Sequence, residues 1–220
     1  MNEVVLVTGS ETLTGRKLIE KLLARGSRVV APVAGRETDT GAGGTPDLTV
    51  LTWNRASWFS TKAVVREAIR VHQRLDAAWL LHPATAARVP FAEAATGDIE
   101  SVLEHSVKST VAMVRELTPH LSDSGGFLGM VLPHRSGGPP DPLDALAKGA
   151  FAEFAGAVFR ESPPSVFACG FIGHSPDADG FTDHLLRLQG ERPEKLRSRW
   201  FRYTEGRRPF GGTGFADSAG

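Results

Sequence analysis

The chain has 220 residues with 25 basic and 25 acidic side chains, so its formal net charge at pH 7 is zero. Because no long run of one charge interrupts the sequence, nothing favours a nucleic-acid or membrane partner. A single cysteine, Cys169, excludes an intrachain disulfide, and no apolar run is long enough to span a membrane. We therefore expect a cytoplasmic protein without a signal peptide, folded as one domain over residues 1–220, with Cys169 as a buried structural thiol.

Short apolar runs predict the strands of a parallel sheet that is covered on both faces. Six such runs occur, at residues 4–7, 28–31, 48–51, 77–81, 127–132 and 165–168. Apolar residues at helical spacing lie between them, and Gly26 closes the first helix. This alternation predicts an α/β fold with a Rossmann-like doubly wound parallel sheet.

The later helices are expected in four places. They are a long helix over 98–121, a helix over 142–160, a short helix over 181–188 and a charged helix over 193–200. The stretch 38–45 is rich in glycine and threonine, so we expect a loop there and assign it no role. The segment after the sixth strand, 173–180, is short and predicts an incomplete substrate lid.

The helix over 142–160 is unusual because its apolar residues surround most of its circumference. Asp141 as an N-cap and Pro142 in the first turn mark its start. A helix that is apolar all round is buried on more than one side. We expect one side to lie on the sheet and another to contact a partner chain. Lys148 follows Asp144 by four residues, the spacing of a helical ion pair.

The turn after the first strand, 8–15, reads TGSETLTG. A dinucleotide site in this fold needs glycines there, one for the tight bend and another for close approach of the pyrophosphate. Gly9 and Gly15 are present, but Leu13 lies between them and would project into the space that a pyrophosphate fills. No phosphate-binding lysine follows, which excludes a P-loop.

In these features the chain resembles the short-chain dehydrogenases/reductases, and the resemblance covers nearly all of it. The first turn of that family reads Thr-Gly-x-x-x-Gly-x-Gly; Thr8, Gly9 and Gly15 match it, whereas Leu13 replaces the middle glycine. The tail, 216–220, is similar to the family's closing Val-Asp-Gly-Gly. Active members transfer a hydride with a nicotinamide cofactor, which the resemblance would imply if the site were intact.

The cofactor-binding positions of the family pattern carry other residues here. The residue that selects NAD or NADP after the second strand is absent from 31–33, although Arg36 follows. The adenine-binding aspartate is absent from 52–54, which reads Thr-Trp-Asn. The family's Asn-Ala-Gly is replaced by His-Pro-Ala at 82–84.

The catalytic positions also differ. The family's asparagine aligns with Ser106, its serine is absent from 131–134, and the tyrosine of Tyr-x-x-x-Lys is replaced by Asp144, ahead of Lys148. A carboxyl group beside a lysine is a poor general acid at neutral pH, because the opposite charge lowers its pKa. We expect Asp144 and Lys148 to form an ion pair instead of a catalytic couple.

These losses predict a catalytically inactive member of the family, with vestigial positions at Ser106, Asp144 and Lys148. The vestigial turn of Thr8, Gly9, Leu13 and Gly15 is expected to bind no cofactor, so that NAD or NADP would belong to a partner subunit. The resemblance implies a two-fold contact through the two long helices, with an active paralogue or with a second copy. The expected contact residues are Val107, Val111, Val114, Phe151, Phe154 and Val158. Heteromeric members of the family pair an active with an inactive subunit, and one type acts on acyl-CoA intermediates.

Two alternatives remain. One is an enzyme with an atypical acid-base site, formed by His82 and His134 together with Asp144 and Lys148. The other is a regulator that senses nucleotide without reacting it, which Leu13 and the missing carboxylates disfavour. No metal site is predicted, because the other histidines lack ligand spacing and there is no cysteine pair.

Overall fold

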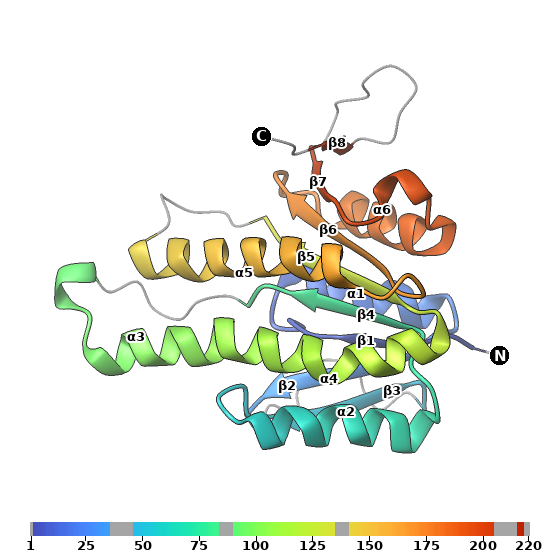
Figure 1. Ribbon diagram of the computed structural model, residues 1–220, viewed down its shortest axis with the longest axis horizontal. Coiled ribbons are helices and arrows are strands. Elements are labelled where there is room, and N and C mark those ends of the chain that lie inside the picture. The colour runs from blue at the N-terminus through green and yellow to red at the C-terminus, as the bar shows by residue number, and fades with distance from the viewer. Residues whose placement is uncertain (1, 36–45, 84–89, 135–140, 205–214, 218–220) are drawn as a thin grey trace.

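The computed structural model describes residues 2–35, 46–83, 90–134, 141–204 and 215–217. Within these residues the strands form one sheet in the order β3-β2-β1-β4-β5-β6-β7-β8, shown in Figure 1. Neighbours are parallel from β3 through β7, and β8 is antiparallel to β7. The predicted doubly wound parallel α/β sheet is confirmed. The expected loop at 38–45 lies outside the described residues.

The predicted strands occur, and three of them, β1, β4 and β5, agree to the residue with the apolar runs. The bounds are β1 Val4–Val7, β2 Arg28–Ala34, β3 Leu48–Trp53, β4 Ala77–Leu81, β5 Phe127–Leu132, β6 Phe167–Gly173, β7 Trp200–Tyr203 and β8 Phe215–Asp217. The expected sixth strand was placed too early in the chain. The seventh and eighth strands were not predicted.

The helices lie between the strands. Their bounds are α1 Leu13–Ala24, α2 Trp58–His72, α3 Thr96–Val102, α4 Ser109–Ser124, α5 Pro142–Glu161 and α6 Ala178–Glu191. A π-helical turn, Leu103–Lys108, joins α3 to α4 and makes the long helix that was predicted. Short 3₁₀ turns occupy Phe91–Glu93 and Glu194–Leu196.

The expected charged helix over 193–200 is wrong. Only one 3₁₀ turn forms there, and Trp200 already begins β7. Ser198 adopts a positive φ of 62°, which a helix interior does not tolerate. The turn therefore ends before a helix can grow.

Each face of the sheet has its own apolar core. Alternate residues of a strand point to opposite faces, so Val4 and Leu6 join one core, whereas Val5 and Val7 join the other. Helices α2, α4 and α5 cover the first face, and α1 and α6 cover the second (Figure 1). Cys169 is fully buried in the second core, as predicted, and burial raises the pKa of its thiol.

The sheet order reverses between β1 and β4. From this point the chain winds outward through β2 to β3 and, in the other direction, through β5 to β7. In open α/β sheets ligands bind at such a reversal, outside the carboxyl ends of the strands. The ends of β1 and β4 therefore mark the place where a cofactor site should be sought. Among the described residues, no helix has the length and apolar character that crossing a membrane requires.

Candidate functional site

The turn between β1 and α1 is held by the chain's own packing. A Cβ atom added to Gly15 would lie 2.1 Å from the carbonyl oxygen of Gly9, and one added to Gly9 would lie 2.7 Å from Cβ of Leu81. Gly9 also has a φ of 78°, which glycine adopts without strain. Both glycines are thus required by the bend itself, whether or not a ligand is bound.

The start of α1 is capped from within the turn. The Thr12 hydroxyl accepts a hydrogen bond of 2.9 Å from the backbone N–H of Gly15 and donates one of 2.8 Å to the Gly9 carbonyl oxygen. A helix N-terminus binds phosphate through such free N–H groups. Here one of them is already used. Leu13, the first residue of α1, is 53% exposed beside the turn.

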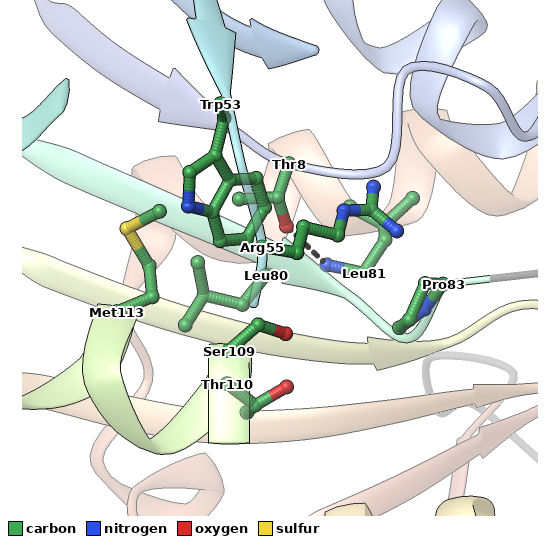
Figure 2. A pocket seen from close by; sticks show the side chains of 9 residues that line it. All are labelled: Thr8, Trp53, Arg55, Leu80, Leu81, Pro83, Ser109, Thr110 and Met113. Carbon is green, nitrogen blue, oxygen red and sulfur yellow. Dashed lines mark hydrogen bonds between the residues drawn. The ribbon is translucent and has the colours of Figure 1, made fainter. Parts of the chain in front are cut away.

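The crevice at the strand reversal is almost completely filled by side chains (Figure 2). The space left in it is about 10 Å³, room for about one water molecule. Its lining comes from β3, β4 and α4 and from the residues that follow β1, β3 and β4. The lining residues are Thr8, Trp53, Arg55, Leu80, Leu81, Pro83, Ser109, Thr110 and Met113.

Trp53 and Arg55 close the crevice on the β3 side. Trp53 is 3% exposed, and its indole Nε1 donates a hydrogen bond of 2.9 Å to the hydroxyl of Thr61. The guanidinium of Arg55 lies over the Trp53 ring, 5.2 Å from the ring centroid. Arg55 is also buried, and it reaches Glu11 in the β1–α1 turn with an Nη2–Oε1 distance of 2.6 Å. This ion pair joins the two loops between which a dinucleotide would enter.

The catalytic positions expected from the family pattern do not form an accessible couple. Ser106 lies buried in the π-helical turn, and its carbonyl oxygen accepts a hydrogen bond from the Thr110 hydroxyl. Asp144 is 8% exposed, whereas Lys148 is exposed. The predicted Asp144–Lys148 ion pair stays a prediction.

The four residues of the alternative acid-base site are not equally accessible. His82 is 3% exposed, and its ring packs against Phe151 with centroids 5.2 Å apart. Asp144 is buried as well, while His134 is partly exposed and Lys148 is exposed. A substrate could reach the last two but not His82. Across the described residues, no group of histidine, cysteine, aspartate or glutamate side chains could hold a metal ion.

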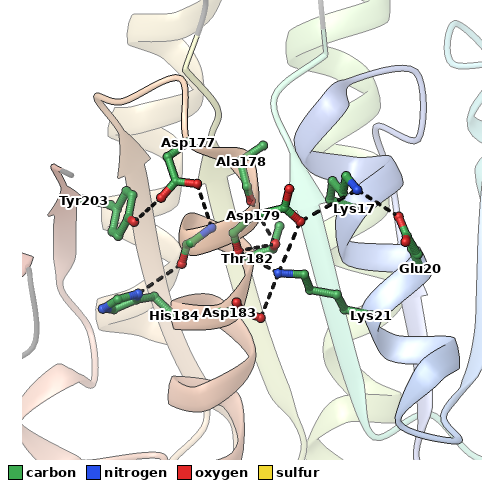
Figure 3. A network of polar contacts seen from close by, with 11 residues as sticks. Lys17, Glu20, Lys21, Asp177, Ala178, Asp179, Thr182, Asp183, His184 and Tyr203 are labelled. Carbon is green, nitrogen blue, oxygen red and sulfur yellow. Dashed lines mark hydrogen bonds and ion pairs between the residues drawn. The ribbon is translucent and has the colours of Figure 1, made fainter. Parts of the chain in front are cut away.

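The connection between β6 and α6 is short and fixed. Only residues 174–177 separate the two elements. Asp177 caps α6 by accepting a 2.9 Å hydrogen bond from the Gly180 N–H, and its other oxygen accepts a 2.8 Å bond from the Tyr203 hydroxyl (Figure 3). These bonds hold the pKa of Asp177 below its usual value. Lys21 of α1 binds the beginning of α6, where its Nζ lies 2.8 Å from the Asp183 carboxylate. The described chain thus has no lid segment at this position, in line with the short loop that the sequence predicts.

The residues expected at a subunit contact divide into two groups. Val114 and Phe151 are 5% and 3% exposed and belong to the chain's own core. Val107, Val111, Phe154 and Val158 are partly exposed, although Phe154 and Val158 also pack against the first core. Sequence reasoning missed Leu103 and Leu146, which are 40% and 50% exposed. The two long helices that carry these residues lie side by side (Figure 1).

A model of the short chain dehydrogenase family matches residues 3–131 of the sequence. The chain belongs to this family. The match spans β1 through most of β5, so it includes the β1–α1 turn and stops before α5. No curated protein matches the sequence.

Three solved structures illustrate the fold that this chain shares with known proteins. An apo SCOR enzyme from Clostridium thermocellum superposes with a TM-score of 0.77 at 17% identity, covering 92% of this chain and 91% of its own. A 3-ketoacyl-(acyl-carrier-protein) reductase from Brucella melitensis, complexed with NADH, superposes with a TM-score of 0.78 at 15% identity. The superposition covers 93% of this chain and 98% of the reductase. The putative carbonyl reductase Sniffer of Caenorhabditis elegans superposes with a TM-score of 0.77 at 16% identity, covering 92% of this chain and 97% of its own. Identities this low establish the fold alone.

The described residues do not fit the nicotinamide dinucleotide that the family implies. Trp53 and Arg55 fill the crevice, and a ligand of that size needs a pocket of about 300 Å³ or more. The Glu11 carboxylate is held by Arg55, so opening the crevice would also break this ion pair. The sequence indicated a poor cofactor site through Leu13 and through the tryptophan in place of aspartate. It did not reveal the roles of Glu11 and Arg55.

Proposed function

We propose that this chain is a non-catalytic member of the short chain dehydrogenase family that acts as a structural subunit. It pairs with an active member of the same family, or with a second copy of itself, and binds no coenzyme. NAD or NADP is then held by the active partner. The substrate of that partner is a hydroxy or keto compound such as an acyl-CoA.

The filled crevice carries this proposal. The space at the strand reversal is about 10 Å³, and its walls are a buried indole and a buried guanidinium paired with Glu11. Removing them would break a hydrogen bond of 2.9 Å and an ion pair of 2.6 Å. Opening the crevice therefore has an energetic cost that a ligand would have to offset.

The catalytic positions support the same conclusion. Hydride transfer in this family needs an acid that reaches the substrate oxygen with a pKa near the working pH. Asp144, in the place of the tyrosine, is buried, and Ser106 is buried within the helix. Lys148 alone remains accessible, and it cannot relay a proton to a missing acid.

Apolar surface on the outer sides of the two long helices supports a subunit contact. Leu103 and Leu146 are exposed there, and Val107, Val111, Phe154 and Val158 are partly exposed around them. Exposed large apolar side chains on neighbouring helices are typical of interaction sites. A two-fold contact would bring the same patch of both subunits together.

Calorimetry with NAD(H) and NADP(H) tests the absence of cofactor binding. We expect no heat of binding up to millimolar nucleotide and no turnover of carbonyl or alcohol substrates by the chain alone. Micromolar binding without turnover would instead favour the nucleotide-sensing alternative. Turnover by the isolated chain would refute the structural role outright.

Light scattering on the purified chain tests the contact. Leu103→Glu and Leu146→Glu each place a charge on the outer helix surface without touching the core, so they should reduce the mass of the assembly to that of a monomer. Phe59→Glu is the matched control, because Phe59 is 86% exposed on α2, away from this surface. A wild-type chain that is monomeric both alone and when co-expressed with an active family member would contradict the proposal.

A further inference from the structure

Two rows of side chains cross the carboxyl ends of β5, β6 and β7 on the face that α5 covers. In the inner row Leu132 pairs with Ile172, and Ile172 pairs with Arg202. Residues two positions further along a strand point to the same face. The next row outward therefore holds His134 after β5 and His174 after β6.

Backbone contacts fix this outer row. A Cβ atom added to Gly173 would lie 3.0 Å from the backbone nitrogen of His134. The backbone N–H of His174 donates a hydrogen bond of 3.0 Å to the carbonyl oxygen of Tyr203. The ends of β5, β6 and β7 are thus held together up to the two histidines, at the usual spacing of about 4.8 Å between neighbouring strands.

A lysine reaches this rim from the covering helix. Lys148 lies near the beginning of α5, which starts at the same edge of the sheet, and its side chain is exposed. Partial burial lowers the pKa of His174, and repulsion from Arg202, Lys148 and His134 lowers it further. Helix α5 contacts β5 and β6, and Arg202 pairs with Ile172, two residues before His174, so the strand register and the covering helix bring these groups to one edge of the sheet. We call the four residues the basic rim cluster: His134, Lys148, His174 and Arg202.

The acidic side chain nearest in sequence to Lys148 is Asp144, which is buried one turn earlier in α5. Elsewhere basic side chains pair with carboxylates: Lys21 lies 2.8 Å from Asp183, and Lys108 lies 3.2 Å from Glu104. Within the ranges that the structure covers, no carboxylate pairs with the three members of the cluster other than Lys148. In a chain whose net charge is zero, this is a local excess of positive charge at the edge where ligands bind in open α/β sheets.

We propose that the basic rim cluster binds an oxyanion, the phosphate or carboxylate group of a small molecule. Arginine binds such groups with two parallel hydrogen bonds, and lysine supplies a point charge. Protonated imidazoles add further donors. The anion would also relieve the repulsion within the cluster. The site lies beyond β5, toward the β7 side of the sheet, and so does not need the filled crevice at β1 and β4 to open. It is therefore independent of the proposed structural role.

The test is a titration of the full chain with inorganic phosphate and, separately, with acetate, in a low-salt buffer that contains neither. Imidazole NMR signals of His134 and His174 report binding. We expect saturation, together with a rise in the pKa of His174, because a bound anion favours the protonated ring. Tighter binding of phosphate would identify a phosphate ester as the ligand class, and tighter binding of acetate would identify a carboxylate.

Charge-removing variants locate the site. Lys148→Ala and Arg202→Ala should each weaken binding about tenfold, the effect of losing one hydrogen bond to a charged group. Lys62→Ala removes the same charge from an exposed position on α2 and should leave affinity unchanged. NMR signals that do not saturate would overturn the proposal, and so would a loss of anion affinity in Lys62→Ala equal to that in Lys148→Ala. The interaction would then be nonspecific screening of surface charge. If Arg202→Ala fails to fold, Lys148→Ala still decides the question, since its side chain is exposed.

Discussion

Replacing Trp53 by alanine should destabilise the chain by about 3–5 kcal/mol, the usual cost of truncating a buried aromatic side chain. The indole is 3% exposed, bonded through Nε1 to Thr61, and covered by the guanidinium of Arg55. Its loss removes apolar burial, leaves a cavity at the strand reversal and deprives a buried hydroxyl of its donor. Urea unfolding followed by circular dichroism measures the change in the free energy of unfolding.

Two further variants separate the packing of Trp53 from its hydrogen bond. Trp53→Phe keeps a ring but loses the N–H, and Thr61→Val removes the acceptor. Either should cost about 1–3 kcal/mol, and the double variant should show a coupling of about 1 kcal/mol. Phe59→Ala serves as the control: it removes an aromatic ring that is 86% exposed, so its effect should stay within about 0.5 kcal/mol. A cost below about 1 kcal/mol for Trp53→Ala would refute the reasoning, because Trp53 would then be a loose cover over an open cofactor site and not part of the core.

Four other outcomes are expected. Gly15→Ala should lower the free energy of unfolding by about 1–3 kcal/mol, because its Cβ would lie 2.1 Å from the Gly9 carbonyl oxygen; an unchanged melting temperature would contradict this. Asp177→Ala should cost about 1 kcal/mol through loss of the α6 cap, whereas Asp177→Asn should retain most of the stability in thermal unfolding. Cys169 should react with a thiol reagent only as fast as the chain unfolds, and rapid labelling of the native protein would show that the core opens. Folding lowers the pKa of His174, so a low pH favours the unfolded chain, which binds the proton more readily. The stability that the neutral imidazole allows is complete above about pH 6.5 and is lost as the pH falls below that value. His174→Gln should therefore reduce the loss of stability between about pH 6.5 and the lower folded-state pKa, and identical pH profiles would exclude this role.

Local sequence patterns predict the middle of the sheet well. The strands β4 and β5 are continuous apolar runs that end at His82 and at Pro133, so their limits are visible in the sequence. Strand β7, by contrast, could not be predicted from the local sequence pattern. Trp200–Tyr203 follows a charged stretch at helical spacing, and only tertiary pairing with β6 makes it a strand.

The sequence could not predict how the crevice is filled. Trp53 ends β3, and Arg55 and Glu11 lie in the loops after β3 and β1, which meet only when the sheet forms. The same limit applies to the helix surfaces. A helix that is apolar all round does not reveal which residues face the sheet, and the π-helical turn at 103–108 changes the angular register of the long helix. Phe151 therefore lies in the core although it was expected at a contact, whereas Leu103 is exposed.

The glycines of the β1–α1 turn lead to a broader point about how enzymes are recognised. Gly15 leaves no room for a methyl group because a carbonyl oxygen of the same turn occupies that space. A substitution there would be penalised in any chain of this shape, with or without a coenzyme. Sequence fingerprints built on these positions therefore detect an architecture, and redox chemistry has to be inferred from the side chains that line the neighbouring crevice.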